Sequence, residues 1–365
     1  MVRELRDTKL IIDLEKIKKN IEVVKNIIGP DVAFMPVIKA NGYGHGAVGI
    51  APAIMETKPA YLAVATLSEA VELKEAHPDY PVFVMGHTPD QYLPYAVEYG
   101  IALTVFDLSQ VTLLGRLASE AGKTATVHVK VDTGFHRLGI YDEEELYEMT
   151  QQPGLEIEGI FSHLALTNDE ENLKQYDLLV AMIEKLEARG CSFKYKHIAD
   201  SISLVDYPEY RMNMVRPGAL IFGLRGFHKG FLPVECCITF ESRITQIHEI
   251  KAGEGVGYDY LWRAPQDTRV GTMPFGYADG YQLSRERDIF RFRDILRYIV
   301  GDLKLFIRKK HLTVSVSGKR AKVLGHIGML HTTVDVTNID CTETSTVTFD
   351  VNPMYVSQSV ERVYE

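Results

Sequence analysis

Two apolar patterns alternate along the first 223 residues of the chain. Short runs rich in β-branched residues, typical of buried strands, are separated by longer stretches in which apolar residues recur every three or four positions, typical of helices. The eight strand-like runs cover residues 32–38, 60–67, 81–86, 101–106, 125–131, 155–162, 193–199 and 219–223. Eight strands that alternate with helices predict an α/β fold, a parallel (β/α)8 barrel of the TIM type.

After Gly223 the pattern changes to closely spaced strands with turn residues between them, as in CITFESRITQI and LTVSVSG. This spacing predicts a β-rich second domain. We place the domains at 1–232 and 233–365, and the short strand at 8–13 is free to join the second. The stretch 284–310 mixes basic and apolar residues. We interpret it as an inserted amphipathic helix packed on the surface, with a membrane or partner contact as the less favoured alternative.

Composition narrows the class of protein. The 365 residues are 46% apolar and 24% charged, as in globular proteins, and the formal net charge of −9 argues against nucleic acid or a membrane as partner. The four cysteines lack C-x-x-C spacing, which favours a reducing compartment. The N-terminus MVRELRDTKL is charged where a signal peptide is apolar. We therefore expect a cytoplasmic enzyme, and we predict no metal site.

Lys39 is the most informative single residue, because it follows the first strand-like run and precedes the loop ANGYGHG. Catalytic groups collect at the carboxyl ends of barrel strands, and a lysine desolvated there becomes an amine nucleophile suited to Schiff-base chemistry. From position alone, a lysine that extends into solvent is an equally good interpretation. Further polar residues stand at or near other strand ends: Lys130, Asp132, Arg137, His163, Asp200, Ser201 and Arg216. Together they predict a site on this face of the barrel.

Several longer segments carry a family resemblance. They include VIKANGYGHG, KVDTGFHRLG, VRPGALIFG, VGYDY and FGYADGY, and similar segments run almost end to end. In these segments the chain resembles the alanine racemases, pyridoxal-phosphate enzymes with an N-terminal barrel and a C-terminal β domain. The resemblance implies an amino-acid racemase that binds pyridoxal 5'-phosphate and forms a homodimer with shared active sites. Alanine is the default substrate, and serine or a larger amino acid remains open.

The resemblance also implies how the cofactor is held. Lys39 would be the Schiff-base lysine. Four groups would bind the phosphate: Tyr43, Ser201 and the backbone of Gly218 and Ala219. Arg216 would bond the pyridine nitrogen, and His163 would lie beneath the ring and join the Arg216 network.

Racemisation removes a proton from one face of a planar carbanion and returns it to the other, so two bases must flank the cofactor. The resemblance assigns these roles to Lys39 and to Tyr258, which would enter from the other subunit. Both side chains have ordinary pKa values of about 10, which must be lowered for work near neutrality. Other residues would contact the substrate or support that contact: Arg137, Tyr277, the backbone of Met329, and Lys130, which is carbamylated in some members and fixes Arg137.

The chain departs from the family pattern at several positions. Leu330 stands where an aspartate is usual, and Asp200 where an asparagine is usual. The C-terminal tyrosine that assists the phosphate is out of register, and the neighbourhood offers Asp350, Pro353 and Tyr355. The insertion at 284–310 is also longer than the family's turn.

Two other functions stay open as alternatives. A decarboxylase on the same barrel-plus-β-domain plan would need a second-domain cysteine, a role that Cys236 or Cys237 would have to fill. A non-catalytic pyridoxal-phosphate carrier would normally lack the β domain.

Overall fold

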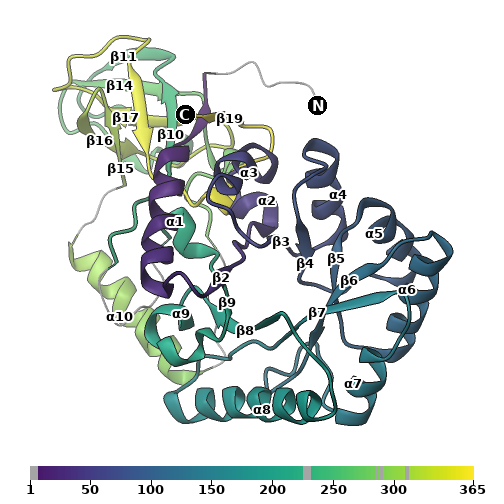
Figure 1. Cartoon of the computed structure of the whole chain (residues 1–365). Coiled ribbons are helices and arrows are strands. Elements are labelled where there is room, and N and C mark those ends of the chain that lie inside the picture. The colour runs from purple at the N-terminus through teal and green to yellow at the C-terminus, as the bar shows by residue number, and fades with distance from the viewer. Residues whose placement is uncertain (1–6, 225–231, 285–286, 288–290, 309–311) are drawn as a thin grey trace. The chain divides into compact units, whose positions relative to one another are not determined.

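The computed structural model describes residues 7–224, 232–284, 287, 291–308 and 312–365. The chain forms two compact units (Figure 1). One unit is Asp13–Cys237, and the other combines Met1–Ile12 with Ile238–Glu365.

The first unit contains an eight-stranded parallel sheet. In hydrogen-bonded order its strands are β2 (Ala33–Phe34), β9 (Met214–Arg216), β8 (Tyr195–Asp200), β7 (Leu155–Phe161), β6 (Ala125–Lys130), β5 (Ala102–Val105), β4 (Val82–Val84) and β3 (Leu62–Val64). A parallel bridge between Val37 and Ala63 joins the segment after β2 to β3 and closes the barrel. The predicted (β/α)8 barrel is confirmed.

Helices surround this ring of strands (Figure 1). They are α1 (Leu14–Ile28), α2 (Lys39–Tyr43), α3 (Ala47–Met55), α4 (Leu67–Ala76), α5 (Leu93–Tyr99), α6 (Leu108–Glu120), α7 (Glu143–Thr150), α8 (Asp169–Ala188) and α9 (Ser203–Asp206). Several begin at a side chain that accepts a hydrogen bond from the first turn, as Asp13 does for α1 and Asp107 for α6. Thr66 and Glu69 form a reciprocal capping box at the start of α4.

One strand differs from the prediction. The apolar run 219–223 is not the eighth strand, because Ala219–Phe222 forms a single 3-10 turn, η3. The eighth strand is β9, and Arg216 is its last residue rather than a residue before it. A short apolar run has no period that separates a strand from one helical turn, and Pro217, which has no N–H to donate, follows the strand directly.

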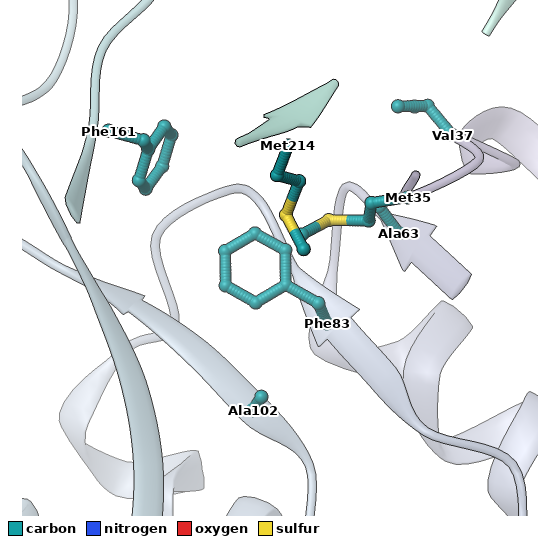
Figure 2. Close-up of a cluster of buried hydrophobic side chains, with 7 residues drawn as sticks. All are labelled: Met35, Val37, Ala63, Phe83, Ala102, Phe161 and Met214. Carbon is teal, nitrogen blue, oxygen red and sulfur yellow. The ribbon is translucent and has the colours of Figure 1, made fainter. Parts of the chain in front are cut away.

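The barrel interior is filled by side chains from several strands. Figure 2 shows seven of them: Met35, Val37, Ala63, Phe83, Ala102, Phe161 and Met214. Polar residues share this interior, since the ring of His197 stacks on Phe161 with centroids 4.7 Å apart, and His128 lies 4.7 Å from Phe83. The barrel core therefore combines aromatic packing with buried imidazoles.

The second unit is built on a nine-stranded sheet, and the predicted β-rich character is confirmed. Its order is β11 (Gln246–Ile250), β14 (Thr268–Met273), β17 (Thr332–Asp335), β16 (Lys319–Leu324), β15 (Thr313–Val316), β18 (Thr346–Phe349), β10 (Ile238–Arg243), β1 (Lys9–Ile12) and β19 (Glu361–Tyr364). The N-terminal strand β1 pairs antiparallel with β10 and parallel with β19. A hairpin of β12 (Gly255–Val256) and β13 (Trp262–Arg263) stands apart from this sheet.

The insertion of this unit contains a helix, as predicted: α10 (Phe292–Arg308). The large aliphatic side chains described between 295 and 305, and that of Phe292, are exposed rather than packed. Within the described ranges, none of the helices combines the length and the apolar composition needed to cross a membrane.

Candidate active site

A cavity of about 240 Å³ opens at the carboxyl ends of the barrel strands. It is lined by Lys39, Ala65, Met85, Gly86, Lys130, Arg137, Leu138, Phe161, His163 and Arg216. Five of the residues predicted from the sequence thus meet in one place, although they come from four well-separated segments of the chain. The pocket contains four potential cations, so it favours a ligand with anionic groups.

Lys39 begins α2, a turn in which Ala40, Asn41 and Gly42 adopt left-handed backbone conformations, with φ of 53°, 52° and 65°. The carboxylate of Glu69 on α4 holds this turn, because it accepts hydrogen bonds from the backbone N–H of Asn41 (3.1 Å) and of Ala65 (2.9 Å). Left-handed conformations cost energy for residues other than glycine, and they persist where the surroundings fix them. Lys39 therefore belongs to a turn whose backbone conformation is fixed by its surroundings.

Burial and the nearby Arg137 lower the pKa of Lys39 from its ordinary value. The same two causes lower the pKa of Lys130 to about 8. Each amine therefore has a larger neutral fraction at neutral pH than a surface lysine has, and only a neutral amine acts as a nucleophile or a base.

His163 follows β7, and its ring lies 5.0 Å from that of Phe135. Burial, followed by the charge of Arg216, lowers its pKa to about 3. The imidazole is therefore neutral at physiological pH, and it contributes a flat polar surface to the cavity rather than a fifth cation.

A second group of predicted residues meets at the start of η3. The Ser201 hydroxyl accepts hydrogen bonds from the backbone N–H of Gly218 (2.8 Å) and of Leu220 (3.4 Å). A Cβ atom at position 218 would lie 2.6 Å from the Tyr43 hydroxyl oxygen, so any side chain there would displace that hydroxyl. Burial raises the pKa of Tyr43 to about 12, which keeps this hydroxyl protonated. Two hydroxyls beside a side-chain-free stretch of backbone form a set of donors suited to phosphate.

Asp200, a departure from the family pattern, has a structural role in the same turn. Its carboxylate accepts hydrogen bonds from the backbone N–H of Ile202 (3.0 Å) and of Ser203 (3.0 Å), and from the Ser203 hydroxyl (2.8 Å). An asparagine oxygen could accept the same bonds. The substitution therefore preserves the turn that presents Ser201.

Arg216 is buried at the end of β9. Its guanidinium donates to the backbone carbonyls of Ser162 (2.8 Å) and Ile198 (3.0 Å), and to Nδ1 of His197. Among the described residues, the imidazole that Arg216 bonds is that of His197, and the expected link between His163 and the Arg216 network stays a prediction. His197 lies on β8, the strand next to β9, whereas His163 lies on the loop after β7. The Nε of Arg216 is buried without a hydrogen-bond partner among the described residues, so it can serve an acceptor placed in the cavity.

A polar chain that was not predicted from the sequence extends from Arg216 into the barrel interior. Nε2 of His197 lies 2.8 Å from Nδ1 of His128, whose Nε2 lies 3.5 Å from the carboxylate of Glu158. Arginine only donates, so His197 carries its proton on Nε2 and His128 carries its proton on Nε2 as well. The sequence does indicate the members of this chain, because each of three adjacent strands has a polar residue that faces inward. The alternation of residues along a strand does not show which of these side chains pair.

The other predicted residues belong to the C-terminal unit. Tyr277 and Met329 lie side by side there, because the N–H of Tyr277 donates to the carbonyl of Gly328 (3.1 Å) and that of Ala278 donates to Met329 (3.0 Å). Leu330 follows Met329 and is exposed.

Tyr258 lies in the turn between β12 and β13, and its side chain is 76% exposed. Tyr355 packs with its backbone against Gly280, at the end of the turn that carries Tyr277.

The chain combines a (β/α)8 barrel with a β-rich unit, and the mouth of the barrel contains Lys39 among other cationic groups. These features place the protein in the class of barrel enzymes that carry a β domain. Comparisons with known proteins make the class specific. The family model for the alanine racemase N-terminal domain matches residues 12–226, and that for the alanine racemase C-terminal domain matches residues 237–360.

Individual relatives agree with these matches. The chain is 35% identical to the alanine racemase of Desulforamulus reducens over 90% of this chain and 85% of that protein. It is 30% identical to the alanine racemase of Clostridium tetani over 100% and 97%.

A solved alanine racemase from Clostridium difficile 630 superposes with a TM-score of 0.87 at 27% identity, covering 100% of this chain and 97% of that one. The Bacillus anthracis enzyme with bound L-Ala-P gives 0.82 at 26% identity, covering 100% and 96%. The chain belongs to the alanine racemase family. It is an isomerase, an amino-acid racemase.

Proposed function

We propose that this protein racemises alanine with pyridoxal 5'-phosphate held at Lys39. The observation that carries the proposal is the barrel-mouth cavity, in which a lysine of lowered pKa faces three further cations and a neutral histidine. Alanine is favoured as substrate because the relatives are alanine racemases, and one solved neighbour is described with bound L-Ala-P.

The residues present fit the cofactor. Tyr43, Ser201 and the backbone at Gly218 and Ala219 would hold its phosphate, next to the position where a Cβ has no room. The unpartnered Nε of Arg216 would donate to its ring nitrogen. Burial lowers the pKa of Arg216 only to about 10, so the guanidinium stays charged and keeps that nitrogen unprotonated. When bound, pyridoxal phosphate supplies the electron sink that acidifies the α-proton of an amino acid.

The chain's own groups would then position the substrate and move its proton. Arg137 would bind the substrate carboxylate, together with the backbone N–H of Met329, and Tyr277 would line the entrance. Lys130, once converted to a carbamate, would hold Arg137 in place. Its burial and lowered pKa increase the fraction of neutral amine, the form that reacts with carbon dioxide to give a carbamate. Nζ of Lys39 would take the α-proton on one face.

Tyr258 would return the proton on the other face from a second copy of the chain, which would make the enzyme a homodimer with shared sites. Its place in an exposed turn of the β12–β13 hairpin supports this assignment. A tyrosine buried in the core of its own unit could not reach a partner's barrel.

The environment of Cys237 does not support the alternative of a decarboxylase, which would need a reactive cysteine. The thiol of Cys237 is buried, accepts a hydrogen bond from Asn20 (3.2 Å) and donates to the carbonyl of Glu235 (3.3 Å). Burial raises its pKa to about 12, which keeps it protonated and unreactive.

The cofactor assignment is tested by reduction with borohydride. The protein loaded with pyridoxal phosphate should absorb visible light, and borohydride should fix the cofactor on the peptide that contains Lys39. A Lys39→Ala variant should bind the cofactor reversibly and give no fixed adduct. An adduct of equal yield on another lysine in that variant would contradict the assignment.

The substrate is tested by chiral chromatography after incubation of the loaded protein with each of the twenty L-amino acids. Alanine should give its D-enantiomer fastest. A faster conversion of serine or of a larger amino acid would replace alanine as the substrate.

A further inference from the structure

Helix α10 carries an apolar face that is turned toward solvent. Five large side chains recur at helical spacing along one side: Phe292, Ile295, Leu296, Ile299 and Leu303. Their exposed fractions run from 36% at Ile295 to 74% at Phe292. A surface helix of a soluble domain normally turns such a stripe inward, so this orientation requires a cause.

The opposite side of α10 carries its less exposed positions. Among the described side chains at 292–305, only Asp294 is buried, while Tyr298 and Gly301 are half-buried. These three positions follow one another at intervals of four and three residues, so they share the side opposite the apolar face. The helix thus presents its apolar face outward.

Basic residues form a row along one edge of the apolar face. Arg293, Arg297 and Lys304 are all exposed, and their spacing of four and seven residues places them on one side of the helix. The segment 291–310 contains seven arginines and lysines against two aspartates, whereas the whole chain contains 40 against 49.

The acidic groups of the helix are already paired with arginine. Asp294 pairs with Arg291 (2.6 Å) and Arg297 (3.4 Å), and Asp302 accepts two hydrogen bonds from Arg287 (2.6 and 2.7 Å). The helix therefore offers a local positive charge on a chain that is acidic as a whole.

We propose that α10 binds the surface of an anionic lipid bilayer. The helix would lie in the plane of the headgroups, with its apolar face at the acyl boundary and its basic row on the lipid phosphates. This inference revises the expectation, drawn from net charge, that the protein has no membrane partner, because the charge that matters here is local. A second copy of the chain could cover the same apolar face, but it would bring two positively charged helices together, so charge complementarity favours the lipid surface.

The test is cosedimentation of the full-length protein with vesicles. Vesicles of equal parts phosphatidylglycerol and phosphatidylcholine should bind it, and vesicles of phosphatidylcholine alone should bind it much more weakly. Leu303→Asp, on the apolar face, should abolish binding. Leu305→Asp is the matched control, because Leu305 is 53% exposed on the other side of the same helix, and it should leave binding intact.

A charge series separates the basic row from general electrostatics. Each basic residue near such a surface contributes roughly a fivefold change in affinity, so Arg293→Gln with Lys304→Gln should lower partitioning roughly 30-fold. Lys319→Gln with Lys322→Gln removes the same charge from an exposed strand of this unit and should change little.

Two results would overturn the proposal. One is equal or absent sedimentation with both vesicle types. The other is a solution mass that falls, by analytical ultracentrifugation without vesicles, in Leu303→Asp and not in Leu305→Asp. That second result would assign the face to a contact between copies of this chain. Neither measurement depends on racemase activity.

Discussion

Glu158 shows how a single buried residue can affect the site from the far part of the barrel. Three donors converge on its carboxylate: the Tyr61 hydroxyl (2.5 Å), the Lys194 ammonium (2.6 Å) and Nε2 of His128 (3.5 Å). Burial raises the pKa of this carboxyl, but the three donors outweigh burial and bring the pKa down to about 2. The carboxylate thus ends the chain from Arg216 with a fixed negative charge, which keeps both imidazoles in the tautomers that Arg216 needs.

The substitution Glu158→Gln should therefore destabilise the fold in a pH-dependent way. Because the folded pKa lies below the unfolded one, the charged carboxylate stabilises the protein above about pH 4.5, and this contribution disappears as pH falls through about 2. We expect the free energy of unfolding to fall by about 1–3 kcal/mol at pH 7, and the difference from the wild type to shrink on acidification. Urea unfolding of both proteins at several pH values measures it.

Glu156→Gln is the control for this substitution, since Glu156 is exposed two residues earlier on the same strand. It should leave the free energy of unfolding nearly unchanged. An equal loss in both variants, or a loss at Glu158 that is independent of pH, would contradict the role given to its charge.

At the scale of elements, the turn η3 depends on the absence of a side chain at Gly218. A Cβ there would meet the Tyr43 hydroxyl at 2.6 Å, so Gly218→Ala should displace that hydroxyl from the proposed phosphate position. The loss of one hydrogen bond to a charged group is worth about 1.5–3 kcal/mol. The dissociation constant of pyridoxal phosphate should then rise roughly 10-fold to 100-fold, as measured by titration of the apoprotein.

A double-mutant cycle identifies the cause. In a Tyr43→Phe background the 2.6 Å contact with the hydroxyl is gone, so Gly218→Ala should cost less there. Losses that simply add would mean that the turn itself, and not its contact with Tyr43, had been damaged.

The same elements show what the sequence can and cannot predict. Seven of the eight barrel strands lie within their predicted runs or differ by one residue, because each combines a buried apolar run with a helix behind it. The eighth was misplaced because a five-residue apolar run at 219–223 is compatible with either a strand or a turn. The pairing of β1 with β10 was not predictable in detail, since alternation does not select a partner more than 220 residues away.

Two other features could not be predicted from the sequence, for related reasons. The helical pattern at 292–308 gives an amphipathic helix, but it does not tell which side faces solvent, and here the apolar side does. The chain of His197, His128 and Glu158 needs the register of three strands before its members can be paired. Patterns therefore predict elements well, whereas contacts between elements depend on register.

At the scale of the whole molecule, the proposed chemistry divides between the two units. Lys39, Arg137 and Arg216 belong to the barrel unit, whereas Tyr258 belongs to the β-rich unit and lies in an exposed turn. In the proposed two-base racemisation, Tyr258 comes from a partner chain, so residues of two chains build each active site.

Mixing inactive protomers tests this arrangement directly. Lys39→Ala and Tyr258→Phe should each lower racemisation in both directions by about 10²–10⁴-fold or more, because every turnover needs both proton transfers. After subunit exchange at equal concentrations, half of the dimers should be mixed, and each mixed dimer should have one intact site and one doubly altered site. Activity should then recover to roughly a quarter of the wild type for a symmetric dimer.

A matched pair of variants serves as the control for this recovery. Lys39→Ala and Arg137→Ala both lie in the barrel unit, so every site in their mixed dimers is defective and mixing them should restore nothing. Recovery in this control would mean that Lys39 and Arg137 of one site come from different chains. No recovery between Lys39→Ala and Tyr258→Phe, when mass spectrometry confirms exchange, would mean that each chain builds its site alone. In that case the opposing base would have to be sought on the same chain as Lys39, and the exposed turn that carries Tyr258 would need another explanation.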